Sequence, residues 1–77
     1  MTDLLKYGFT ETRKTDSWTE YEGHGFRITI FDYLYKTFAG SEINIRTFTV
    51  NTQKTSSMAF PLDTIEEWLK SKNINPA

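Results

Sequence analysis

The sequence has no cysteine and only one histidine, and these absences exclude several kinds of site. No disulfide can staple the fold, and no cysteine-bound zinc or iron–sulfur centre can form. No apolar run approaches the roughly 20 residues that a membrane-spanning helix needs. The chain does not open with a basic and then apolar segment, so no signal peptide is expected. These absences predict a cytoplasmic protein with no bound cofactor.

Neither positive nor negative charge is in clear excess. Nine Lys and Arg residues stand against ten Asp and Glu residues, which gives a formal net charge of −1. Proteins that bind a nucleic-acid backbone usually carry a clear basic excess. The composition therefore argues against a protein whose main task is to neutralise phosphates.

The chain is short, and aromatic residues supply much of its apolar content. Its 77 residues are about half the usual length of a domain, so we expect a single domain over residues 1–77. Aromatic residues make up 16% of the chain, and twelve threonines accompany them. Both residue types suit a pleated sheet. A domain this small, without staples, depends on regular packing or on a partner subunit.

The first residues predict a short helix over residues 2–8. Thr2 or Asp3 can cap its start, and Gly8 suits the left-handed position at its end. Phe9 can then pack back as the apolar contact that follows such an end. Other apolar contacts of this helix would come from Leu4, Leu5 and Tyr7.

A second helix is predicted near the end of the chain. Pro61 is well placed at a helix start, and Thr64 with Glu67 matches a capping box. The helix should end near Asn73, with Ile74 folding back. One face of the helix collects its apolar residues: Leu62, Ile65, Trp68 and Leu69.

Four strands are expected between the helices, over residues 9–14, 18–22, 26–35 and 43–52. Residues 23–25, Gly-His-Gly, predict a hairpin turn, and the other connections before residue 43 are also short. Residues 53–57 are interpreted as a polar loop and 58–60 as a short edge segment. The predicted fold is therefore α+β in the order α-β-β-β-β-α. Its four-stranded antiparallel meander would pack one face on the C-terminal helix.

Alternation along the strands sorts the side chains onto two faces. Ile28 and Ile30 are predicted on the face that the C-terminal helix covers. Asp32 falls in the same register, although a carboxylate is unfavourable among aliphatic side chains. The second face is predicted to gather aromatic and arginine residues as a partner-binding surface: Tyr21, Arg27, Phe31, Tyr33, Tyr35, Arg46 and Phe48. Such residue types are enriched in protein interfaces.

This second face needs a cover, because monomers rarely expose large apolar patches. The sequence leaves three alternatives for what packs on this face. The N-terminal helix could pack there through Leu4 and Leu5, a second copy of the chain could stack there, or a foreign partner could bind there.

Catalytic and metal chemistry find little support. His24 lies between two glycines and is interpreted as an exposed turn residue, since a lone base needs a positioned nucleophile or acid beside it. Glu20 and Glu22 alternate along one strand, where solvated pairs with basic residues are the expectation. Together with Asp32 and His24 they match no known ligand spacing. We expect neither an enzyme nor a metal protein.

The sequence therefore predicts a small non-catalytic interaction domain. It would present the aromatic face to a protein partner or to a second copy of itself, as an accessory protein of a bacterium, phage or mobile element. The alternative is a single-stranded nucleic-acid binder that stacks bases on the same aromatic residues. Acidic residues outnumber basic ones, so this alternative is the weaker of the two.

Overall fold

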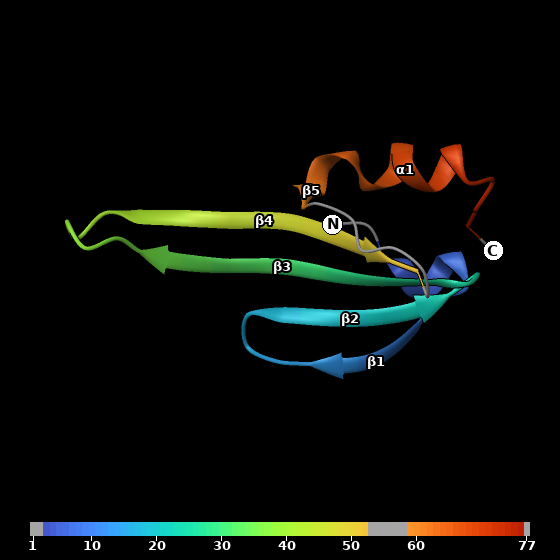
Figure 1. The fold of residues 1–77 in the computed structure, drawn as a ribbon, viewed down its shortest axis with the longest axis horizontal. Helices are drawn as coiled ribbons and strands as arrows, with labels where there is room; N and C mark the ends of the chain where they lie inside the picture. The colour runs from blue at the N-terminus through green and yellow to red at the C-terminus, as the bar shows by residue number, and fades with distance from the viewer. Residues whose placement is uncertain (1–2, 53–58, 77) are drawn as a thin grey trace.

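The computed structural model describes residues 3–52 and 59–76 and has an α+β fold (Figure 1). One antiparallel sheet holds five strands in chain order: β1 (Thr10–Lys14), β2 (Trp18–Gly23), β3 (Phe26–Lys36), β4 (Glu42–Asn51) and β5 (Phe60–Pro61). A 3-10 helix, η1 (Leu4–Tyr7), precedes the sheet. A second 3-10 turn, η2 (Leu62–Thr64), and the helix α1 (Ile65–Ser71) follow it.

The predicted class and the antiparallel meander are confirmed, and two details differ. The N-terminal helix is a single 3-10 turn, and the sheet has a fifth, two-residue strand rather than four strands alone. β5 pairs through Thr47 with Pro61 and Phe48 with Phe60, close to the predicted edge segment. The predicted polar loop over 53–57 lies outside the described residues.

The hairpin between β2 and β3 closes through His24 and Gly25. Both have positive φ, at 53° and 82°, as a two-residue type I′ turn requires. The predicted Gly-His-Gly turn is thus confirmed. It fixes the register from Gly23 opposite Phe26 to Trp18 opposite Phe31.

Strands β3 and β4 run on together beyond the rest of the sheet. β2 reaches no further than Phe31 along β3, and β5 no further than Thr47 along β4. Among the described residues, the two strands form a ladder only with each other from Asp32 opposite Arg46 to Lys36 opposite Glu42, and one further hydrogen bond joins the Asp32 amide to the Ser17 carbonyl. We call residues 32–46 the arm. It makes the molecule elongated, with extents of 42 × 25 × 21 Å (Figure 1).

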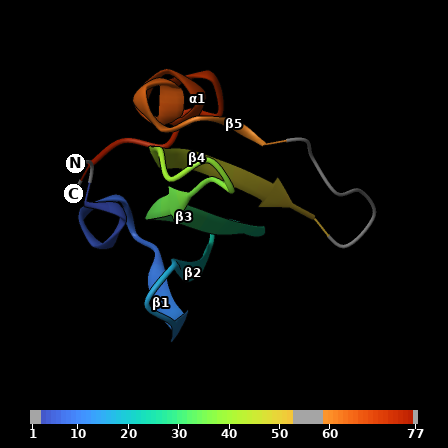
Figure 2. The same cartoon turned by 90° about the vertical axis from the view of Figure 1, so that its left-hand side faces the viewer.

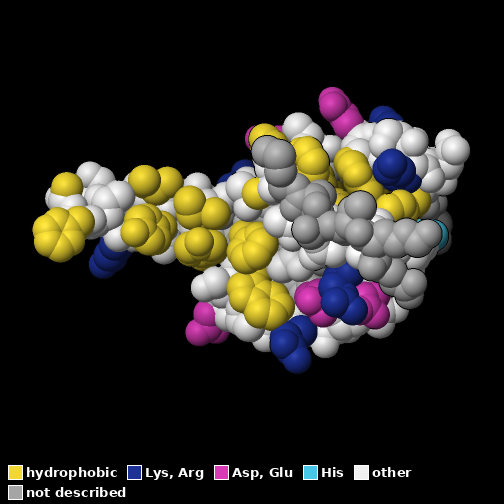
Figure 3. Space-filling view, viewed as in Figure 1, with side chains coloured by type: hydrophobic (Ala, Val, Ile, Leu, Met, Phe, Trp, Pro, Cys, Tyr) yellow, Lys and Arg dark blue, Asp and Glu magenta, His cyan; other side chains and the backbone are white. Residues whose placement is uncertain are grey.

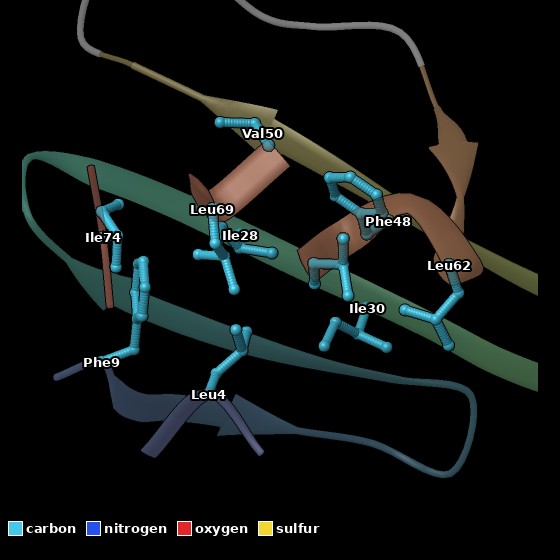
Figure 4. Close-up of a cluster of buried hydrophobic side chains, with 10 residues drawn as sticks. Leu4, Phe9, Ile28, Ile30, Phe48, Val50, Leu62, Leu69 and Ile74 are labelled. Atoms are coloured by element: carbon cyan, nitrogen blue, oxygen red, sulfur yellow. The ribbon is translucent and has the colours of Figure 1, made fainter. Parts of the chain in front are cut away.

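The core lies on one face of the sheet, away from the arm (Figure 4). Its buried side chains come from both ends of the chain and from the two long strands: Leu4, Phe9, Ile28, Ile30, Phe48, Val50, Leu62, Ile65, Leu69 and Ile74. The predicted packing of the C-terminal helix on the aliphatic face is confirmed. Trp68 is only half-buried, with its ring edge-on to Phe26 at 5.1 Å.

Both helices end in the same backbone motif. After η1, Gly8 is left-handed, and the amides of Gly8 and Phe9 donate to the carbonyls of Leu5 and Leu4. After α1, Asn73 is left-handed, and its amide and that of Ile74 donate to Lys70 and Leu69. This is the Schellman arrangement, and its trailing residues, Phe9 and Ile74, are both buried in the core. Figure 2 shows the C-terminal segment running from α1 towards η1.

Two local predictions about the helices are wrong. The Thr64 side chain caps no backbone amide, and its hydroxyl donates to the Pro61 carbonyl at 2.8 Å instead. Leu5 is exposed, whereas Leu4 and Tyr7 make the apolar contacts of η1 with the core. The predicted cap at the start of η1 is confirmed for Asp3, whose carboxylate accepts from the Leu5 amide.

Candidate interaction surface

The strand registers determine which side chains share the second face of the sheet. Directly opposite residues of an antiparallel pair point to the same side. Phe31 faces Trp18 on β2, Tyr33 faces Ile45 on β4, and Tyr35 faces Ile43. We call these residues the arm face: Trp18, Phe31, Tyr33, Tyr35, Ile43 and Ile45.

The seven residues predicted as partner-binding are divided between the two sides of the sheet. Four lie on the side of the arm face: Arg27, Phe31, Tyr33 and Tyr35. Three lie on the core side: Tyr21, Arg46 and Phe48. Their placement on the second face was wrong because it depended on an assumed register, and a one-residue difference moves a side chain to the other face.

Each of the three misplaced residues has a partner on the core side. Phe48 lies opposite Ile30 and is fully buried. Tyr21 packs partly buried against the core, and burial raises the pKa of its phenol, with the nearby Glu11 and Asp3 carboxylates raising it further. Arg46 lies 3.8 Å from the Asp63 carboxylate at the start of η2.

Three residues of the arm face were missed as partner-binding candidates: Trp18, Ile43 and Ile45. The sequence contained a signal for Trp18. If the two-residue turn is His24 and Gly25, then Gly23 lies opposite Phe26, and the same register places Trp18 opposite Phe31. The isoleucines lacked such a signal. The connection from β3 to β4 runs over residues 37–41, and a loop of that length allows more than one register.

Neither helix covers the arm face. Leu4 of η1 and Leu69 of α1 both belong to the core on the opposite side, so the N-terminal helix is excluded as its cover. Tyr35 and Ile43 are 53% and 47% exposed, and Phe38 at the tip of the arm is fully exposed. Figure 3 shows these apolar side chains as a continuous row along the projecting arm.

All the charged residues of the arm lie on one of its two sides, together with Leu34 and Asn44. No charged residue lies on the arm face itself. The other side of the arm carries four charges in two cross-strand pairs of opposite sign, Asp32 opposite Arg46 and Lys36 opposite Glu42. Asp32 shares the register of Ile28 and Ile30, but it marks neither a bulge nor a strand end. β3 runs on past the core at that point, and Asp32 lies opposite Arg46.

Charges reappear where the arm face meets the body of the protein. The Arg27 guanidinium lies 2.8 Å from the Glu22 carboxylate, as expected of a carboxylate paired across the sheet. Glu20 accepts from the Thr12 hydroxyl at 3.0 Å. A shallow hollow near this border is lined by Thr10, Glu22 and Arg27 among others. Its two charged groups already neutralise each other, so the hollow offers a ligand no unmatched charge.

His24 has a structural partner. Its Nε2 lies 2.6 Å from the Tyr7 carbonyl oxygen, to which it donates a hydrogen bond, and its ring packs edge-on against Phe9 at 5.1 Å. The imidazole thus links the β2–β3 turn to the end of η1. The carboxylates do not gather around it, since Asp32 lies on the core side of the sheet while Glu20 and Glu22 lie on the other.

Other kinds of site were sought over the same residues. Among the described residues, no group of three or more His, Cys, Asp or Glu side chains could hold a metal ion. No helix in that part of the chain is long and apolar enough to cross a membrane. Comparisons with models of protein families, with curated proteins and with solved structures gave no match.

Proposed function

We propose that this chain is a non-catalytic interaction domain and that the arm face is its protein-binding surface. The single observation that carries the proposal is an apolar, charge-free face held out from the body of the protein, with Tyr35 and Ile43 each about half exposed. Large exposed apolar patches on small proteins mark interaction sites.

The isolated state of the arm supports the same function. A two-stranded ribbon is at best marginally stable in water, because only one ladder of hydrogen bonds holds it. In the described part of the chain, residues 32–36 and 42–46 form a strand ladder only with each other. A protein that packs on the arm face would supply the missing contacts, and aromatic side chains are the residues that anchor such interfaces.

Binding of single-stranded nucleic acid is the weaker candidate. Arg46 and Phe48, two of the residues that such binding would use, lie on the core side of the sheet. Arg27 remains on the arm-face side, where the Glu22 carboxylate neutralises it. The arm face itself carries no cation, so stacking on Phe31 and Tyr33 would bring no positive charge to the phosphates of a strand.

Photo-crosslinking tests the proposal with a closely matched control. A photoreactive phenylalanine replaces Tyr35 on the arm face or Leu34 on the other side of the arm, and the cells are irradiated. The two positions are adjacent in sequence and similarly exposed, at 53% and 64%. We expect covalent adducts with protein from position 35 and few from position 34.

The result that overturns this function is equally direct. Equal labelling from both positions, or adducts from neither, would mean that the arm face is not a preferred contact surface. The identity of the adduct, either this chain or another protein, is read from its mass.

A further inference from the structure

We propose that the occupant of the arm face is the arm face of a second copy of the chain, stacked on it about a two-fold axis. This inference rests on the proposed function and names its partner. In a two-fold interface the same patch meets itself, so the patch must be self-complementary. The charges, the area and the shape of the arm each meet that requirement.

The charges favour self-association. A face that carried charges of one sign would repel its own copy, whereas the arm face carries none. The four charges on the other side of the arm balance in cross-strand pairs and would stay in water. The formal net charge of −1 also leaves little long-range repulsion between two copies.

The apolar area of the arm face together with the tip residue Phe38 is sufficient for a weak dimer. Phe38 is fully exposed, Tyr35 and Ile43 are about half exposed, and the other arm-face residues are partly exposed. With about 150–250 Å² for each large side chain, roughly 500 Å² is available per copy. Two copies would bury on the order of 1,000 Å², an area typical of weak, reversible interfaces.

The shape of the arm allows two copies to approach. The arm projects from the body along the 42 Å axis, so two arms can overlap while the bodies stay apart (Figure 1). Stacking on the face is favoured over pairing at the edges. Lys36 and Glu42 lie beside the open edges of the arm near its tip, and charged side chains at edges oppose strand addition.

Sedimentation of the purified chain over a concentration series tests the inference. We expect the wild-type chain to show a reversible monomer–dimer equilibrium. Ile43→Lys places a charge in the stacked face and should weaken the dimer by about tenfold or more. Leu34→Lys makes a similar change on the other side of the arm, at a similarly exposed position, and should leave the equilibrium unchanged.

The alternatives give different results. A wild-type monomer at every concentration overturns self-association, and so does a dimer that Leu34→Lys weakens as much as Ile43→Lys. Far-ultraviolet circular dichroism confirms that each variant folds, and Tyr35→Ser replaces Ile43→Lys if the latter does not. If the chain is monomeric while position 35 crosslinks to a different protein in cells, the second copy is excluded and the proposed function stands. If no crosslinks form either, both fail.

Discussion

At the scale of the residue, Gly8 and Gly23 mark the place where the end of η1 packs closely against the β2–β3 hairpin. A Cβ built on Gly8 would lie 2.9 Å from His24 Nε2, and one built on Gly23 would lie 2.8 Å from the Phe9 ring. The hydrogen bond from His24 to the Tyr7 carbonyl depends on this closeness. The lone histidine thus serves packing at this point, and its place between two glycines is explained without catalysis.

Gly8→Ala should therefore destabilise the protein more than a left-handed backbone alone explains. Gly25 has nearly the same φ, 82° against 86°, but has no atom within 4 Å of an added Cβ. We expect Gly25→Ala to cost about 1 kcal/mol in the free energy of unfolding, and Gly8→Ala at least about 1 kcal/mol more. Urea unfolding of the two variants measures the difference. Equal losses would show that the contact with His24 is not tight in solution.

At the scale of the element, the sequence predicts which side chains alternate along a strand better than it predicts the register between neighbouring strands. Alternation along β4 puts Ile43 and Ile45 on one face and Phe48 and Val50 on the other, which is the division that the structure has. Which of these pairs joins Ile30 depends on the β3–β4 connection, whose length does not determine the register. That one unknown accounts for the misplacement of Phe48 and Arg46.

The helix ends show the opposite case, in which local chemistry is enough. Gly8 and Phe9 predict the end of η1 correctly, since few residues other than glycine adopt the left-handed conformation readily. The prediction at Thr64 fails because η2 comes before α1 and turns that hydroxyl towards the Pro61 carbonyl. A capping box in sequence does not reveal a preceding 3-10 turn.

The apolar face of α1 provides a test of the core. Leu69 is fully buried, so Leu69→Ala should cost about 3 kcal/mol in the free energy of unfolding. Trp68 is half-buried, and its replacement by Ala should cost less, about 2 kcal/mol. Glu67→Ala, on the exposed side of the same helix, should change stability by no more than about 0.5 kcal/mol. Chemical denaturation of the three variants checks this order, and a larger loss from Trp68→Ala than from Leu69→Ala would contradict it.

At the scale of the whole molecule, both helices pack on one side of the sheet, opposite the arm face. Alternation predicts an aliphatic face and an aromatic face, and the structure keeps that division on β3. What the sequence could not reveal is the position of η1. A four-residue 3-10 turn is too short for its apolar pattern to indicate which side of the sheet it covers. Its contact with the core through Leu4 is therefore known from the structure alone.

The charge distribution of the whole molecule also predicts how it behaves towards nucleic acid. The net charge is −1, the arm face carries no cation, and Arg27 at its border is neutralised by Glu22. Affinity for a nucleic-acid strand depends on phosphate neutralisation and therefore on salt. We expect a fluorescent single-stranded oligonucleotide to show no change in polarisation with this protein, even at low ionic strength. Tight binding that weakens with salt, and that Phe31→Ala or Arg27→Ala abolishes, would contradict this prediction. It would show that this side of the sheet binds a nucleic acid and not a protein.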